Sequence, residues 1–204
     1  MVQVFNEKIF NLLNSAKEIS LKELKRSGED KSSVEAKKIQ DTQSLKDLLA
    51  QSRKALLSQN STKMNVLCAR GHLIYTMRLL AHNKITDQST ESRFSVVDMS
   101  GEERVSNTGA TGPHMQESIK TNKSISTFNK VIEALARRDS EGKNSLPPYR
   151  DSQFTMLLKD ILGGNCITSM IVTLSKAFHR ANETIKTLEI ARFAKLIHSK
   201  VVSI

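Results

Sequence analysis

An aspartate and a glycine that follow an apolar stretch form the part of this sequence best suited to chemistry. Residues 94–97 predict a strand, and Asp98 and Gly101 come directly after it with two residues between them. A carboxylate at a strand end can hold a magnesium-bound water, and a glycine amide can approach a terminal phosphate because no Cβ is in the way. The pair therefore predicts a nucleotide switch, although many strands also end in an ordinary Asp-x-x-Gly turn.

The strands that must position this pair are short and apolar. Residues 73–79 and 94–97 predict strands separated by a polar loop at 82–92, and residues 170–174 predict a buried strand. The chain opens with a strand end at 3–5, which we expect to run into a short apolar helical turn over 9–13. Between 14 and 42 the residues are mostly charged or polar, and they predict loop and weak strand.

Helical spacing accounts for most of the remaining chain. It predicts a helix from Ser44, with Ser44 and Asp47 as a capping box, and three further helices over about 116–138, 154–162 and 182–200. The second of these four helices should bury one face, formed by Ile125, Phe128, Ile132 and Leu135. Strands that alternate with helices favour an α/β layered fold.

Composition restricts the class of protein and of partner. The chain has 204 residues, 38% of them hydrophobic and none of them Trp, and 31 basic against 21 acidic residues give a net charge of +10. This charge favours an acidic partner, but the few aromatic residues are not interleaved with basic ones as in a surface that stacks bases. No apolar run approaches the length that spans a bilayer, and the start lacks a signal-peptide pattern. Cys68 and Cys166 are isolated, which predicts two buried thiols in a reducing compartment, and the histidines show no metal-ligand spacing.

Seven short motifs in a fixed order extend the switch interpretation. They are Phe5-Asn6-Glu7-Lys8-Ile9-Phe10-Asn11-Leu12-Leu13, Asn65-Val66-Leu67-Cys68-Ala69-Arg70-Gly71-His72, Asp98-Met99-Ser100-Gly101-Glu102-Glu103-Arg104, Asn122-Lys123-Ser124-Ile125, Tyr149-Arg150-Asp151-Ser152, Leu162-Gly163-Gly164-Asn165 and Glu183-Thr184-Ile185-Lys186-Thr187-Leu188. This order and spacing resemble the kinesin motor domain family over residues 4–200. The resemblance implies a partial motor fold, with a mixed central sheet, helices on both faces, and the N-terminal strands and phosphate-binding loop missing. Residues 1–200 would form the partial domain, with 14–43 poorly matched and 201–204 starting a neck-linker-like tail.

The resemblance also implies that the nucleotide site is incomplete. The family's loop, G-x-x-x-x-G-K-[ST], is absent from the sequence, whose single Gly-Lys pair, Gly142-Lys143, has no second glycine at the required distance. In the first switch motif, Cys68, Ala69 and Gly71 stand where the family has serines that contribute to magnesium and phosphate coordination. We therefore expect no intact catalytic residue, no bound metal and no cofactor, whereas the intact family uses ATP and magnesium. The switch remnants are Asn65, Arg70, His72, Asp98, Gly101, Glu103 and Asn122.

The face that binds microtubules in the family is better preserved. Tubulin is acidic, so the resemblance predicts contacts by Lys120, Lys123, Lys130, Tyr149, Arg150, Asp151 and Lys159. Gln153 and Met156 replace a usual Lys and Arg, which predicts weakened binding. Simpler interpretations remain open: the lysines can be an ordinary solvated helix face, Arg150 with Asp151 can fix a loop, and His72 can be a structural residue at a strand start.

The expected function is that of a kinesin-like, microtubule-associated protein without ATPase or motor activity of its own. One alternative is a truncated part of an ATP-dependent microtubule motor, and another is an unstable, non-functional remnant. We expect microtubules as the partner, with neither membrane nor nucleic acid and no dimerising coiled coil. The expected location is the cytoplasmic cytoskeleton, with the nucleus and the spindle left open.

Overall fold

The computed structural model describes residues 1–26, 36–59, 71–101, 112–142, 146–199 and 201. The chain divides into two compact units, Met1–Thr121 and Asn122–Ile204. Each unit has its own secondary structure, and the predicted mixture of strands and helices is confirmed.

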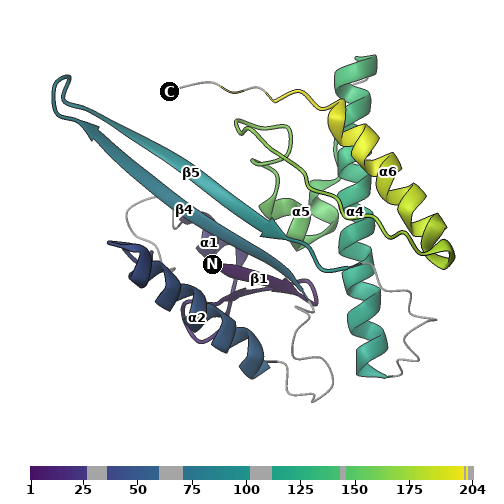
Figure 1. The fold of residues 1–204 in the computed structure, drawn as a ribbon, viewed down its shortest axis with the longest axis horizontal. Coiled ribbons are helices and arrows are strands. Elements are labelled where there is room, and N and C mark those ends of the chain that lie inside the picture. Colours follow the sequence, from purple (N-terminus) through teal and green to yellow (C-terminus); the bar gives the residue numbers. More distant parts are fainter. Residues whose placement is uncertain (27–35, 60–70, 102–111, 143–145, 200, 202–204) are drawn as a thin grey trace. The chain divides into compact units, whose positions relative to one another are not determined.

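An antiparallel sheet forms the centre of the first unit (Figure 1). Its strands lie in the order β3-β2-β1-β4-β5, and every neighbouring pair is antiparallel. The strands are β1 (Val2–Phe5), β2 (Lys8–Asn11), β3 (Lys17–Ile19), β4 (His72–Asn83) and β5 (Gln88–Asp98). The sheet thus brings residues 2–4 beside residues 72–74, from a distant part of the chain.

The opening hairpin corrects the helical turn predicted over 9–13. β1 turns into β2 through Asn6 and Glu7, both at positive φ (57° and 59°), which matches the right-handed twist of a two-residue hairpin. In β2 the exposed Lys8 precedes the buried Ile9, so the side chains alternate between the faces of the sheet. The apolar residues at 9–13 fit both the helical spacing and the alternating spacing of a strand. Residues 8–11 form a strand because they pair with β1.

Two helices accompany the sheet, α1 (Leu21–Arg26) and α2 (Thr42–Gln59). The start of α1, which was not predicted, is a reciprocal capping box: Glu23 N donates to Ser20 Oγ and Ser20 N donates to Glu23 Oε2. The box predicted at Ser44 is displaced by one turn, because Ser44 N donates to Asp41 Oδ1 while Asp41 N donates to Ser44 Oγ. Asp41 therefore caps α2.

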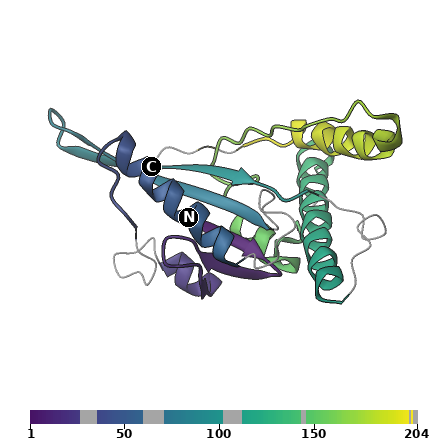
Figure 2. The ribbon, with the colours of Figure 1, turned by 60° about the horizontal axis from the view of Figure 1, so that its bottom comes forward.

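A small apolar cluster holds α2 on one face of the sheet (Figure 2). Ala55 of α2 is buried with Leu12 and Leu73, and the half-buried Leu56 and Tyr75 pack against the same cluster. Along the strands, the side chains that point to the opposite face of the sheet are also buried, among them Val4 and Ile74.

Strands β4 and β5 continue beyond the rest of the sheet as a two-stranded ribbon, residues 75–83 paired with residues 88–96 (Figure 1). The predicted polar loop at 82–92 is therefore wrong, and only residues 84–87 make the turn. Polar side chains form cross-strand pairs here, such as Thr76 with Ser95 (3.1 Å) and Arg78 with Glu91 (3.0 Å). Such pairs stabilise a ladder without the apolar alternation by which a strand is recognised in a sequence.

The second unit is helical. Its elements are most of α4 (Pro113–Glu141), η1 (Tyr149–Asp151), α5 (Gln153–Leu157), η2 (Phe178–Arg180) and α6 (Ala181–Lys195). The predicted long helix and its buried face are confirmed, since Ile125, Phe128, Ile132 and Leu135 are at most 8% exposed. Phe128 packs against Phe154 with ring centroids 6.1 Å apart, which joins α4 to α5.

Three predictions for the second unit need correction. The segment 170–174 is neither a strand nor buried: Ile171 is 92% exposed, and Met170 and Val172 line a groove with residues of α4 and α6. An apolar strand is buried by neighbours on both edges, and the described residues provide none for this segment. The helices α5 and α6 end at Leu157 and Lys195, before the predicted ends, and Cys166 is half-buried rather than buried.

Candidate functional site

The start of β4 and the end of β5 meet at the predicted nucleotide switch. Leu73 pairs with Asp98 across the ladder, so His72 lies beside the turn that follows β5. The Nδ1 atom of His72 accepts a hydrogen bond from the backbone N–H of Ser100 at 3.2 Å. The ring therefore helps to hold the turn that carries Asp98 and Gly101.

This contact requires the neutral imidazole, because a protonated Nδ1 cannot accept a hydrogen bond. His72 is only 2% exposed, and burial lowers its pKa from 6.5 to about 4. At neutral pH the ring is thus an uncharged acceptor, which agrees with the structural role considered for His72.

Asp98 and Gly101 are both exposed at the end of β5. A Cβ on Gly101 would meet nothing within 4 Å, so space alone does not require glycine there. The carboxylate and the open backbone could face a hydrated cation or a phosphate, which is the chemistry predicted for the pair. Among the described residues, no group of three acidic, His or Cys side chains is arranged to hold a metal ion.

Gly71 is the one altered position of the first switch motif that the structure describes. A Cβ at Gly71 would overlap the backbone carbonyl oxygen of Val4 in β1 and would approach Phe5 Cβ to 3.1 Å. No side chain fits without movement of that strand. The serine that the resemblance leads us to expect at this position would therefore conflict with the close packing of the chain against β1.

Other predicted switch residues cannot be placed in this site. Asn65, Arg70 and Glu103 lie outside the described residues, as do Cys68 and Ala69. Asn122 lies on α4 at the start of the second unit, and its side chain is half-buried.

Basic side chains line one side of α4. Lys123, Lys130 and Arg137 repeat at intervals of seven residues, and all three are exposed. Residues seven apart lie nearly above one another on an α-helix, and Lys120 lies one turn before this row. Arg137 pairs with Glu133 on the same helix, whereas the lysines leave their charge facing solvent.

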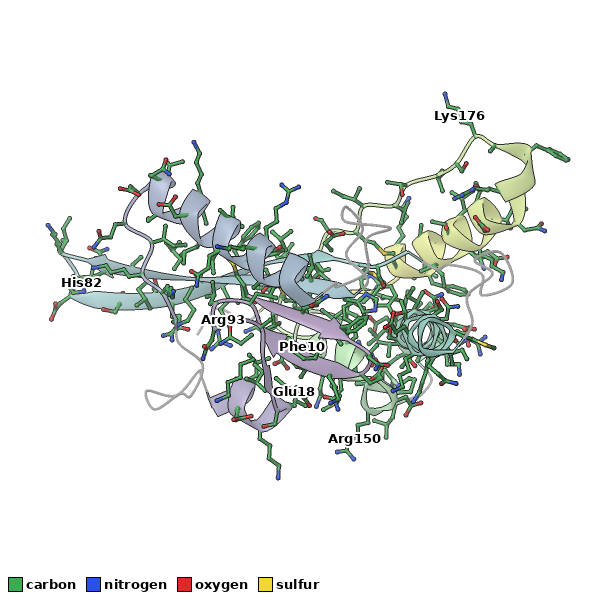
Figure 3. The ribbon with its side chains drawn as sticks, turned by 90° about the horizontal axis from the view of Figure 1, so that it is seen from below. Phe10, Glu18, His82, Arg93, Arg150 and Lys176 are labelled. Atoms are coloured by element: carbon green, nitrogen blue, oxygen red, sulfur yellow. The ribbon has the colours of Figure 1, made fainter. Side chains whose placement is uncertain are left out.

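The segment after α4 carries the other predicted contacts. Arg150, Asp151 and Lys159 are exposed, and Figure 3 shows Arg150 pointing away from the ribbon. Tyr149 differs, because it is half-buried and its hydroxyl donates to the carbonyl of Leu162 at 2.6 Å. Burial raises the pKa of this phenol. Its side chain thus serves the packing of the unit.

Ser152 and the paired glycines give this segment its shape. Ser152 caps α5 by accepting from Phe154 N, at 3.2 Å. Gly163 has φ of 70°, and a Cβ there would come within 2.8 Å of Leu135 Cδ2. Gly163 therefore allows close packing on α4.

A half-buried carboxylate near the end of α4 was not predicted. Asp139 Oδ1 accepts from Arg138 Nε at 2.8 Å, and Oδ2 accepts from the backbone N–H of His198 at 2.9 Å. Burial raises the pKa of Asp139, but the bonds from Arg138 and His198 outweigh it and leave the pKa below its usual value. The carboxylate fastens the segment after α6 to the end of α4. No sequence signal links positions 59 residues apart.

No helix among the described residues is long and apolar enough to cross a membrane.

Comparisons with known proteins agree on one family. The sequence profile described as the kinesin motor domain matches residues 1–197. The chain is 35% identical to kinesin-like protein KIF13A from Mus musculus and to kinesin-related protein 1 from Dictyostelium discoideum, in each case over 98% of this chain but only 12% and 9% of the relative.

Solved structures give the same result. A KIF14 dimer in its two-heads-bound state, with AMP-PNP and in complex with a microtubule, matches with a TM-score of 0.81 and 29% identity over 98% of this chain and 58% of that one. A fast kinesin, studied for its ATPase mechanism and its interactions with microtubules, matches with a TM-score of 0.77 and 28% identity, over 99% of this chain and 56% of the other. The chain thus spans somewhat more than half of the solved chains and a small part of the curated relatives.

Proposed function

Because this chain belongs to the kinesin motor domain family, we propose that it associates with microtubules and does not hydrolyse ATP by itself. The proposal covers residues 1–200 as a partial motor domain, with residues 201–204 as the start of a tail. It places the protein on the cytoplasmic cytoskeleton.

The exposed basic row on α4 is the observation that supports microtubule binding. Among the described residues, the structure records no ion pair on α4 for Lys123 or Lys130. Both lysines lie on the helix that matches the family's Asn-Lys-Ser motif. Arg150 and Lys159 add charge from the following segment. Tubulin is acidic, and the KIF14 structure is of a microtubule complex, so the same attraction is proposed here.

Two observations support the absence of independent ATP hydrolysis. The sequence contains no G-x-x-x-x-G-K-[ST], so it supplies neither the backbone cradle nor the lysine that such a loop provides for phosphates. The packing of Gly71 against Val4 also leaves no room for a hydroxyl side chain at that switch position. Asp98 and Gly101 then remain as parts of the turn, and no magnesium or ATP is proposed to bind the isolated chain.

The test is microtubule co-sedimentation of the purified chain, with and without Mg-ATP, over a range of salt concentrations. We expect binding that falls with salt and is unchanged by ATP. The double variant Lys123→Glu, Lys130→Glu should bind microtubules about tenfold more weakly. Each exposed ion pair that is lost should reduce the binding free energy by about 1 kcal/mol or less. The control is the double variant Lys46→Glu, Lys54→Glu, whose two lysines are exposed on α2. It has the same change of net charge and should bind microtubules as the unmodified chain does. Equal losses in both double variants would show that only net charge matters.

A second function, part of an ATP-dependent microtubule motor, is favoured by the small share of each relative that the chain spans. ATP turnover by the isolated chain, stimulated by microtubules, would support it over our proposal. The unstable-remnant alternative predicts no cooperative unfolding transition, which urea titration followed by circular dichroism would detect.

A further inference from the structure

The last turn of α4 carries an exposed serine directly after two arginines and an aspartate. Its sequence is Arg137-Arg138-Asp139-Ser140-Glu141, and the helix ends there. The Ser140 hydroxyl donates to the carbonyl of Ala136 within this turn, at 2.7 Å. A serine with arginines at the third and second positions before it is the charge pattern that Arg-directed protein kinases select. Because helix ends fray, the hydroxyl can reach such an enzyme while the packed part of α4 stays folded.

The same turn fastens the segment that follows α6, whose end lies beside the end of α4 (Figure 1). Asp139 Oδ2 accepts from the backbone N–H of His198 at 2.9 Å, and Oδ1 accepts from Arg138 Nε at 2.8 Å. The Asp139 side chain is 9% exposed, so water competes little for these bonds. Among the described residues, Arg138 Nη2 is buried without a hydrogen-bond partner. The guanidinium therefore gains a bond if a second acceptor comes within its reach.

We propose that Ser140 is a phosphorylation site for an Arg-directed serine kinase, and that its phosphate releases the segment after α6 from Asp139. The kinase transfers the γ-phosphoryl group of ATP. Ser140 Oγ forms the new bond to phosphorus, the bond from phosphorus to the ADP oxygen breaks, and the hydroxyl proton passes to the catalytic carboxylate of the kinase.

The release follows from the charge that the phosphate adds. A phosphoserine carries a charge of about −1.5 to −2, and here it would stand next to Asp139 in the last turn of a helix, where the helix dipole already disfavours negative charge. The phosphate also competes for the Arg138 guanidinium, which binds phosphate oxygens well. Repulsion and the loss of Arg138 both move the Asp139 carboxylate, so its bond to the N–H of His198 is weakened.

The tripeptide Arg-Asp-Ser occurs twice in the chain, and the structure distinguishes the two copies. In the second copy, Arg150-Asp151-Ser152, the third position before the serine is Tyr149 and not an arginine. Ser152 is 2% exposed, and its hydroxyl accepts from Phe154 N as the cap of α5. A phosphate there would break the cap. Ser152 is therefore an internal control that should stay unmodified.

A kinase assay tests recognition. The purified chain is treated with the catalytic subunit of cAMP-dependent protein kinase and Mg-ATP, and peptide mass spectrometry locates the phosphate. We expect it on Ser140 and not on Ser152. Arg137→Gln removes an exposed arginine that pairs with Glu133 and not with Asp139, and it should slow the phosphorylation about tenfold or more. The matched control Lys130→Gln, which removes an exposed cation of the same helix, should leave the rate within about twofold.

Hydrogen exchange of the full chain tests release and needs no kinase. Phosphoserine is incorporated during synthesis at Ser140 or, as the matched control, at Ser126, an exposed serine of α4 about 20 Å away along the helix. We expect the His198 amide to exchange about tenfold faster or more with the phosphate at position 140, and within about twofold of the unmodified rate with the phosphate at position 126. In the Asp139→Asn variant, phosphoserine at position 140 should change the rate by less than about twofold.

Three results would overturn the proposal. They are a Ser140 that the kinase leaves unmodified, an unchanged His198 exchange rate with phosphoserine at position 140, and equal acceleration by the phosphates at positions 126 and 140. Circular dichroism and the exchange of amides 125–135 in each protein show whether the second unit is folded. No measurement here uses microtubules or ATP turnover by the chain itself, so failure of this proposal and failure of the proposed function are distinguishable.

Discussion

Protonation of His72 should make the first unit lose stability below neutral pH. The ring is 2% exposed and its Nδ1 accepts from the backbone N–H of Ser100 at 3.2 Å. Burial lowers its pKa from 6.5 to about 4. Between these two values the unfolded chain binds a proton that the folded chain does not, so acid favours unfolding.

The size of this effect follows from the two pKa values. A difference of one pKa unit corresponds to 1.36 kcal/mol, so a pKa that falls from 6.5 to about 4 corresponds to about 3 kcal/mol. The stabilisation by neutral His72 is complete above pH 6.5. It is lost progressively as the pH falls from 6.5 to about 4, and below that both states are protonated and the loss stops growing.

Urea unfolding followed by circular dichroism, at several pH values from 7.5 to 4, would measure this loss. His72→Asn is the comparison, because the Asn Oδ1 can accept in place of Nδ1 and does not titrate. Other histidines and the carboxylates titrate in both proteins, so the difference between their pH profiles isolates His72. We expect the free energy of unfolding to fall by about 3 kcal/mol more in the unmodified chain than in the variant. Identical profiles would refute the assignment of His72 as a buried neutral acceptor.

Three further substitutions test packing. Gly71→Ser should lower the free energy of unfolding by about 1–3 kcal/mol, because its Cβ would overlap the Val4 carbonyl; an unchanged thermal midpoint would contradict this packing. Asp139→Asn should cost about 1.5–3 kcal/mol, since a charged acceptor for the N–H of His198 is lost, and exchange of that amide should become faster. Tyr149→Phe should cost about 1 kcal/mol by leaving a carbonyl without its donor, while microtubule pelleting stays unchanged; weaker pelleting at unchanged stability would instead make the hydroxyl a microtubule contact.

Local patterns in the sequence were sufficient to predict the family, the long helix of the second unit and the turn that carries Asp98 and Gly101. Helix α4 was predictable because Ile125, Phe128, Ile132 and Leu135 recur at helical spacing and bury one face. The turn after β5 was predictable because Asp98 and Gly101 follow an apolar strand. The cap at Ser20 and Glu23 was also present in the sequence as a Ser-x-x-Glu pattern, although it was overlooked.

Long-range pairing decided what these patterns left open. Residues 9–11 became a strand because β1 pairs with them. In the polar stretch 82–92, residues 82–83 and 88–92 became part of a ladder because each has a partner across the ribbon, and residues 84–87 form the turn. The apolar segment at 170–174 stayed exposed because no described strand pairs with it. The sequence by itself determined the family, and it shows that these 204 residues contain no G-x-x-x-x-G-K-[ST], since both are properties of local order and residue type. Only the tertiary structure decided that Gly71 must lack a side chain and that Asp139 holds the N–H of His198, because both depend on atoms brought together from distant parts of the chain.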